Sequence, residues 1–292
     1  MYIRDLYGEQ KPVISFEVFP PKQESSLESI TDSLAQMASL NPGFISVTYG
    51  AGGTGNNSMT TSIASLIKNK LGATPMAHLT AVAAKTSDIS GILKELKANN
   101  IFNIMALRGD LPENFSGNPD GDFKYAYQLI EFIKENGDFC CGGAFYPEGH
   151  IACDNLADNY VHAYMKQEAG ADFLVSQLFF DNEKFYDFAD NAKRKGITIP
   201  LVAGIMPILG KSQVQRMIFQ CGVSLPSSII RILHKYENNP VDLQKAGIEF
   251  ACRQIESLLE NGHKYIHIYS MNKPEIAIAC KTTFDNLVHR GE

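Results

Sequence analysis

Eight short apolar segments, spread along the whole chain and separated by segments with helical spacing, constrain the fold more than any other feature of this sequence. Each is of strand length, and its apolar residues are nearly continuous instead of alternating with polar ones. This pattern is typical of strands that are covered on both faces, as in a parallel sheet. The predicted strands are 13–19, 44–49, 75–81, 103–108, 139–146, 173–180, 200–206 and 265–270.

The intervening segments carry apolar residues at helical spacing. In 25–40 the stripe consists of Leu27, Ile30, Leu34 and Met37, and the Ser-Ser pair at 25–26 favours an N-cap. Segments 86–99, 122–136, 154–169, 182–195 and 274–287 are predicted helices as well. Segment 211–262 is longer than one helix and has a break at LPSS (225–228), so we expect two or three helices there.

Eight strands alternating with helices predict a single-domain (β/α)8 barrel that spans residues 1–292. The competing fold is a doubly wound sheet, which would be favoured by a glycine-rich phosphate loop after the first strand. That loop reads FPPKQESS, and neither GxGxxG nor GxxxxGK[ST] follows any predicted strand. The barrel is therefore the better prediction.

Composition excludes several classes of protein. A net charge of −6 leaves no electrostatic footprint for nucleic acid or an anionic membrane. No apolar run reaches the length of a bilayer span, and the charged N-terminus does not resemble a signal peptide. The six cysteines form no CxxC pair, and no cluster shows metal-ligand spacing. We expect reduced thiols, no metal and a cytoplasmic location.

Glu17 is a lone acid within the first apolar segment, VISFEVFPP. Burial removes water from a carboxylate, so its pKa should rise unless another group pairs with it. Such an acid can hold a proton near neutrality and serve as a general acid. The alternative is a structural Glu17 paired with an Arg or Lys across the core.

Polar side chains also stand at the ends of most predicted strands, where a barrel of this type carries its chemistry. Each has a structural alternative. His78 could be a satisfied core histidine, the tyrosines could serve packing, and Arg108 could simply pair with Asp110 on a tight turn. The glycine-rich 50–55 could bring N–H groups to a ligand or only turn the chain. The strand-end residues are Glu17, Thr48, Tyr49, His78, Arg108, Gly109, Asp110, Tyr146, Gln177 and Tyr269.

An ordered set of motifs resembles the methylenetetrahydrofolate reductase family. The set comprises SFEVFPPK (15–22), ISVTYGAGG (45–53), AHLT (77–80), ALRGDLP (106–112), YPEGH (146–150), AGADFLVSQLFFD (169–181), GIMPI (204–208) and IHIYSMNK (266–273). It covers nearly the whole chain. The chain looks like the short bacterial form, with the catalytic barrel and no additional regulatory domain. The resemblance implies an FAD-containing barrel, which agrees with the missing Rossmann fingerprint.

Residue roles carried over by motif are implications of this resemblance. Gln177 would bind the folate pterin and the nicotinamide, with Gln213, Tyr269 and Lys273 nearby, and Asp110 would also bind the pterin. Two positions depart from the family, which often has Asp at Asn159 and usually Arg at Lys273. The implied cofactor contacts are Thr48, Tyr49, Ala51, His78, Arg108, Gly109, Asp110, Ala126, Tyr146, His150, Asn159, His162 and Lys166.

The resemblance also implies a reaction and its participants. NADH or NADPH would reduce FAD and leave, and 5,10-methylenetetrahydrofolate would then accept hydride to become 5-methyltetrahydrofolate. Glu17 would protonate N10 of the folate, and the charge of Asp110 would make reduced flavin a better donor. Family analogy favours a homo-oligomer. The alternatives are a flavin-free folate-binding methyltransferase barrel and a non-enzymatic barrel subunit of a larger assembly.

Overall fold

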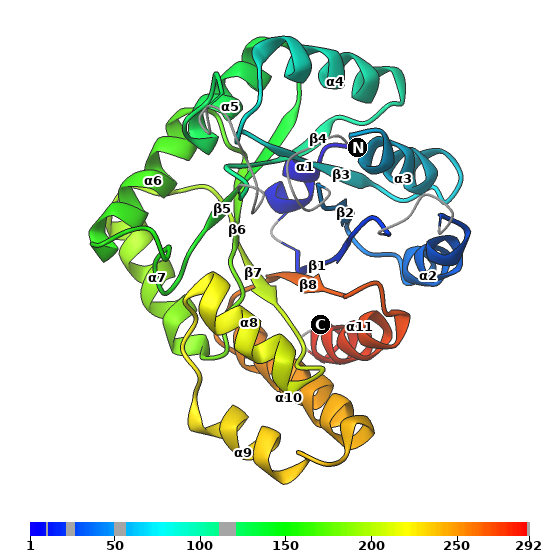
Figure 1. The fold of residues 1–292 in the computed structure, drawn as a ribbon, viewed down its shortest axis with the longest axis vertical. Coiled ribbons are helices and arrows are strands. Elements are labelled where there is room, and N and C mark those ends of the chain that lie inside the picture. Colours follow the sequence, from blue (N-terminus) through cyan, green and yellow to red (C-terminus); the bar gives the residue numbers. More distant parts are fainter. Residues whose placement is uncertain (10, 22–26, 50–56, 111–120, 291–292) are drawn as a thin grey trace.

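Eight parallel strands close into a barrel in the computed structural model, which describes residues 1–9, 11–21, 27–49, 57–110 and 121–290 (Figure 1). Each strand pairs with the next along the chain, and the last pairs with the first, so the predicted (β/α)8 barrel is confirmed. The strands are β1 (Val13–Val18), β2 (Ile45–Val47), β3 (Pro75–Thr80), β4 (Asn103–Leu107), β5 (Cys140–Phe145), β6 (Phe173–Ser176), β7 (Leu201–Ile205) and β8 (Tyr265–Tyr269).

Each predicted strand runs past the observed one by at least one residue, and the overrun is largest at the sixth. The apolar run 173–180 predicts a strand to Phe180, whereas β6 ends at Ser176. The run continues because Leu178 and Phe180 leave the sheet and pack in a second cluster with Val214 and Ile229. Both side chains are buried, as those of strand residues are, so the apolar pattern does not distinguish this loop from a strand.

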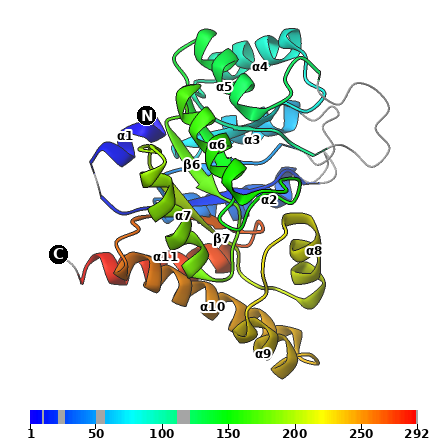
Figure 2. The ribbon, with the colours of Figure 1, turned by 90° about the vertical axis from the view of Figure 1, so that its left-hand side faces the viewer.

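Helices cover the outside of the barrel. All the predicted helices occur, and segment 211–262 holds three of them; the predicted caps Ser25 and Ser26 lie outside the described residues. Figure 2 shows the short α9 beside one end of the long α10. The covering helices are α2 (Leu27–Ser39), α3 (Asn57–Asn69), α4 (Thr86–Ala98), α5 (Ala126–Glu135), α6 (Leu156–Glu168), α7 (Asn182–Arg194), α8 (Lys211–Cys221), α9 (Ser227–Lys235), α10 (Pro240–Glu260) and α11 (Pro274–Val288).

Two helices were not predicted, α3 and the short α1 (Ile3–Gly8). Helix α3 is rich in Ser and Thr, which obscure a buried stripe that includes Met59, Ile63 and Ile67. Helix α1 closes the amino-terminal mouth of the barrel. Its Tyr7 ring packs edge-on against the ring of Tyr265, with the centroids 4.6 Å apart.

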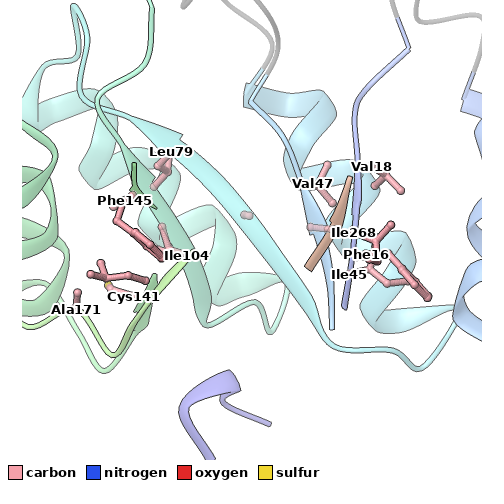
Figure 3. Close-up of a cluster of buried hydrophobic side chains, with 14 of the residues drawn as sticks. Phe16, Val18, Ile45, Val47, Leu79, Ile104, Cys141, Phe145, Ala171 and Ile268 are labelled. Atoms are coloured by element: carbon pink, nitrogen blue, oxygen red, sulfur yellow. The ribbon is translucent and has the colours of Figure 1, made fainter. Parts of the chain in front are cut away.

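Alternation along the strands separates an apolar outer face from a mixed interior. On β1, Phe16 and Val18 point outward and pack with Ile45, Val47 and Ile268 in the layer under the helices (Figure 3). The residues between them, such as Glu17, therefore face the interior. No helix among the described residues is both long and apolar enough to cross a membrane.

Candidate active site

The carboxyl-terminal half of the barrel interior holds a polar cluster around Glu17. Strand register sets its members, because Glu17 lies opposite Ser46 on β2 and Tyr269 on β8, while Ser15 lies opposite His267. The Glu17 side chain is 18% exposed, and its Oε2 lies 3.5 Å from His78 Nε2 and 3.6 Å from His267 Nε2. The sequence placed one acid here, and the fold surrounds it with two imidazoles.

Hydroxyl groups hold the His267 ring beside this acid. Ser15 Oγ lies 2.7 Å from His267 Nδ1 and 3.2 Å from the carbonyl oxygen of Ile266. When Ser15 donates its hydroxyl to Nδ1, the ring carries its proton on Nε2, which then faces the Glu17 carboxylate as a donor. Ser46 Oγ lies 3.3 Å from the same Nε2 and 3.5 Å from Glu17 Oε2.

The sequence predicted a raised pKa for Glu17 unless another group paired with the carboxylate, and in this structure other groups do. Burial raises the pKa of Glu17, but the His267 hydrogen bond, the charges of His78 and His267, and the Ser46 hydrogen bond together hold it below its ordinary value. The alternative prediction of a paired glutamate named the wrong partners, since histidines and not Arg or Lys surround it. The partners come from β3 and β8, distant in sequence from β1.

His78 is the least satisfied member of the cluster. Burial lowers its pKa to about 4, while the charge of Glu17 opposes the shift and that of His267 adds to it. The ring is therefore neutral at physiological pH. Its Nε2 is buried and has no hydrogen-bond partner among the described residues, although Glu17 Oε2 is near. An unsatisfied buried nitrogen at a barrel mouth is a position where a ligand atom would be stabilised.

A cleft opens at the same end of the barrel as this cluster, at the carboxyl ends of β4 and β5 and against α6. Seven of the residues implied for the cofactor line it together, from four separate stretches of chain: Arg108, Ala126, Tyr146, His150, Asn159, His162 and Lys166. The other lining residues are mostly apolar or aromatic: Ala106, Leu107, Tyr125, Tyr127, Ala144, Phe145, Ala152 and Cys153. Such a cleft suits a large ligand with aromatic and anionic parts.

Lys166 reaches the cleft from α6 across β5. Gly143 makes room for it, since a Cβ at that glycine would lie 3.1 Å from Lys166 Cδ. Lys166 Nζ donates to the Ala144 carbonyl oxygen at 2.7 Å. Burial lowers the pKa of Lys166 to about 8, opposed by the nearby Cys153. This cation is incompletely hydrated, so an anionic group of a ligand would stabilise it.

The loop that follows β5 is held by Asn159. Its Oδ1 accepts a hydrogen bond from the backbone N–H of His150 at 2.8 Å, and the side chain is buried. A carboxylate would make the same bond, so Asn at this position retains the hold on the loop. The His150 ring meets the Tyr146 ring edge-on, with the centroids 4.7 Å apart. Burial raises the pKa of Tyr146 to about 12, and the charge of Asp110 adds to the effect.

The strand-end motif around Arg108 adopts a turn that requires glycine. Gly109 has φ +80°, and a Cβ there would lie 2.8 Å from Thr80 Cβ. Arg108 lines the cleft, and Asp110 acts electrostatically on Tyr146. Among the described residues no ion pair joins Arg108 to Asp110, so the simple turn-pairing alternative does not hold there.

Four implied substrate residues lie on the β6, β7 and β8 side of the barrel. Gln177 Oε1 accepts from the Leu178 backbone N–H at 2.9 Å. The Gln213 side-chain amide bonds to the loop after β7 at both of its polar atoms. Its Oε1 accepts from the Leu209 backbone N–H and its Nε2 donates to the Pro207 carbonyl oxygen, so Gln213 holds this loop in place. Tyr269 donates its hydroxyl to the Ser176 carbonyl oxygen at 2.7 Å.

Lys273 is the most peripheral of the four and is partly exposed. Its Nζ lies 3.4 Å from the Glu275 carboxylate. The neighbouring Asn272 exchanges two hydrogen bonds of 2.9 Å with the backbone of Phe19, which fixes the end of β1 near Glu17. Of the remaining implied contacts, Thr48 and Tyr49 directly follow β2, and Ala51 lies outside the described residues.

Sequence reasoning missed His267, Ser46 and Ser15. His267 interrupts the apolar run 265–270 just as Glu17 interrupts 13–19, so the same signal could have identified it. Its ring stacks on Phe44 at 5.6 Å and is almost fully buried. The cleft residues Tyr125, Tyr127 and Cys153 carried no such signal.

Together the fold and the site define a TIM-barrel protein whose site lies at the carboxyl ends of its strands, where enzymes of this fold carry theirs. The sequence comparisons place it more closely. The family model described as methylenetetrahydrofolate reductase matches residues 2–283, and the chain belongs to that family.

Several relatives illustrate this membership, and one solved structure shares the fold. The chain is 33% identical to the 5,10-methylenetetrahydrofolate reductase of Pectobacterium carotovorum, over 92% of this chain and 89% of that protein. The Escherichia coli protein of the same name is 32% identical, over 92% and 90%. Against the Arabidopsis thaliana methylenetetrahydrofolate reductase (NADH) 1 the identity is 33%, over 94% of this chain but only 49% of that protein. A Clostridium thermocellum protein, described as uncharacterised and as binding two copies of 5-methyl-5,6,7,8-tetrahydrofolic acid, shares the fold at 16% identity and a TM-score of 0.66, with 99% of this chain and 100% of that chain covered.

Proposed function

We propose that this protein reduces 5,10-methylenetetrahydrofolate to 5-methyltetrahydrofolate, with bound FAD and with NADH or NADPH as the electron donor. The observation that carries the proposal is the convergence of seven family-implied cofactor residues on one cleft, at the same end of the barrel as the partly buried Glu17. Family membership over residues 2–283 supports the substrate class.

The described residues fit FAD. Arg108 and Lys166 would bear on its phosphates or its polar arm, because both are cations that line the cleft. Tyr125 and Tyr127, whose rings stack 5.6 Å apart, and His162, 6.0 Å from Tyr125, offer flat surfaces for an aromatic ring. When bound, FAD would supply the acceptance and release of hydride.

Glu17 would supply the proton that opening of the folate ring requires at N10. Its pKa lies below its ordinary value, so the carboxylate form dominates at neutral pH without substrate. His267 Nε2 and Ser46 Oγ, both next to Glu17 Oε2, are the groups that would orient the carboxyl and share its proton. A folate over the barrel mouth would exclude water from this cluster, which favours the protonated acid.

Gln177 is suited to recognise an amide-bearing ring. Its Oε1 is occupied by Leu178, and no described residue accepts from its Nε2. It therefore has a donor to offer to the pterin or to a nicotinamide carboxamide. Asp110 would place a negative charge near the flavin and accept from the pterin.

The proposal is tested on the purified protein. We expect a yellow protein with the visible absorption of flavin, bleached under anaerobic conditions by NADH or NADPH and recoloured by methylenetetrahydrofolate with release of 5-methyltetrahydrofolate. The relative rates of bleaching identify the preferred donor. A colourless protein that takes up no added FAD but binds 5-methyltetrahydrofolate would overturn the reductase and support the flavin-free folate barrel.

A further inference from the structure

A hydrogen bond joins two loops whose bonded residues lie 76 positions apart in the sequence. The first is the β5 loop (146–155), between β5 and α6, and the second is the α8 turn (222–226), between α8 and α9. The backbone N–H of Ser224 donates to Glu148 Oε2 at 3.0 Å. Gly222, which has φ +67°, lies so close to the β5 loop that a Cβ added to it would be 3.7 Å from Ile151 Cβ. The two loops therefore meet at two points.

Glu148 belongs to a loop that is fixed on the cofactor side. Tyr146, His150 and Cys153 of the β5 loop line the cleft. Within the loop, the Gly149 N–H donates to the Tyr146 carbonyl oxygen at 3.1 Å, and the Cys153 N–H donates to the His150 carbonyl oxygen at 2.8 Å. The β5 loop therefore keeps its shape through its own hydrogen bonds, independently of the bond that Glu148 makes to the α8 turn.

The α8 turn packs on the substrate side of the barrel. Val223, adjacent to Ser224, is buried in the cluster that contains Leu178, and Tyr269 packs against the same cluster. The backbone N–H of Leu178 in turn holds Gln177 Oε1 at 2.9 Å. The position of the α8 turn therefore bears on Gln177 and Tyr269, two of the residues implied for substrate binding.

We infer that Glu148 is a positioning residue for the folate substrate: its bond to Ser224 fixes the α8 turn, and with it Gln177 and Tyr269, relative to the cofactor cleft. The inference rests on the proposed function for the identity of the substrate. Glu148 Oε1 is buried and has no hydrogen-bond partner in the described part of the chain, so the acid is costly at this place and the Ser224 bond is the contact that offsets the cost.

The role needs the reach of the side chain and an acceptor oxygen, but not a charge, because the donor is a neutral backbone N–H. Glu148→Gln keeps the reach and an acceptor and removes the charge. Glu148→Asp keeps the charge but is one methylene shorter, so it should lose the bond, as Glu148→Ala does. The three substitutions therefore separate the hydrogen bond from the charge.

Equilibrium binding of 5-methyltetrahydrofolate to the full chain tests the inference, because it requires no turnover. In Glu148→Ala and Glu148→Asp we expect the Kd to rise about 3–10-fold, the loss typical of one hydrogen bond, and in Glu148→Gln we expect the wild-type Kd. Glu237→Ala is the matched control: it removes an exposed carboxylate that bonds to Lys211 at the start of α8, and it should leave the Kd unchanged.

Two further measurements distinguish positioning from a general loss of structure. In Glu148→Ala we expect the FAD content of the wild type, because the β5 loop keeps its own hydrogen bonds. Amide hydrogen exchange in the α8 turn should become faster, because the Ser224 N–H loses its acceptor. Glu148→Asp carries the same comparison should Glu148→Ala not fold.

The outcomes separate this inference from the proposed function. Wild-type folate affinity in Glu148→Asp and Glu148→Ala, an equal loss in Glu148→Gln, or a loss of FAD in step with the loss of folate affinity would overturn the inference and leave the proposed substrate intact. A wild-type protein that binds no 5-methyltetrahydrofolate would overturn both.

Discussion

Replacing Glu17 by Gln isolates the chemical role of the buried acid from its structural one. Gln has nearly the same shape, and its amide can still contact Ser46 and the His267 ring, so we expect the variant to fold and to keep FAD. It cannot supply a proton. The nicotinamide half-reaction should therefore persist while the folate half-reaction is lost.

The size of the loss follows from the environment of Glu17. A positioned general acid contributes about 10²–10⁴-fold, which corresponds to about 3–5 kcal/mol of transition-state stabilisation. The pKa of Glu17 lies below its ordinary value, so only a small fraction of Glu17 carries a proton at neutral pH, and this fraction falls further as the pH rises. In the wild type we expect the folate half-reaction to slow with rising pH, by up to about tenfold per unit, and in Glu17→Gln we expect this dependence to vanish.

Stopped-flow measurement of each half-reaction across a range of pH decides the matter. Ser46→Ala is the matched control, since it removes one hydrogen bond to Glu17 but leaves the acid in place. We expect a modest effect in that variant and the same pH dependence as the wild type. A Glu17→Gln protein that reduced methylenetetrahydrofolate at a near wild-type rate, or kept the wild-type pH slope, would refute the reasoning.

Three further substitutions probe the rest of the site. Asp110→Asn should raise the flavin reduction potential and weaken folate binding, because a negative charge near the ring is removed. At an effective dielectric of about 20 the effect is a few kcal/mol at most. A redox titration that finds an unchanged or lower potential would contradict the placement of Asp110 near the flavin. Gln177→Glu should slow both half-reactions, the folate one more, because the free Nε2 donor is lost; defects confined to FAD retention would assign Gln177 a structural role. The pKa of Lys166 is about 8, so the affinity of the wild type for FAD should fall as the pH rises through that value and the cation is lost. Lys166→Met should bind FAD more weakly and show no such step. Fluorescence titration at several pH values measures both affinities, and an identical step in the variant would exclude Lys166 as its cause.

The barrel was readable from the sequence because its signals are local. Strand length, continuous apolar character and the helical stripes between strands all lie within short windows, and the ordering of eight such units leaves few folds. The failures are local ambiguities as well. Buried loop residues such as Leu178 look like strand residues, and the Ser/Thr-rich α3 looks like a loop.

The candidate site was only partly readable. Glu17 could be found because a charge in an apolar run is conspicuous, and the cleft residues were identified by motif resemblance. The sequence could not say which groups would surround Glu17. Strand register decided that, since it brings Ser46 and His267, far apart in the chain, to the same level of the barrel. These partners are the reason that the pKa of Glu17 is lowered and not raised.

The sequence alone thus determined the kind of element at each position and the presence of a lone acid among apolar residues. The tertiary structure decided the properties that depend on a partner, such as the ionisation of Glu17 and the hydrogen bonds of Gln213 to the loop after β7. The physical reason is one of range. Hydrophobic periodicity is a property of neighbouring residues, whereas charge, hydration and hydrogen bonding are set within a few ångströms in space, by groups that only the closed barrel brings together.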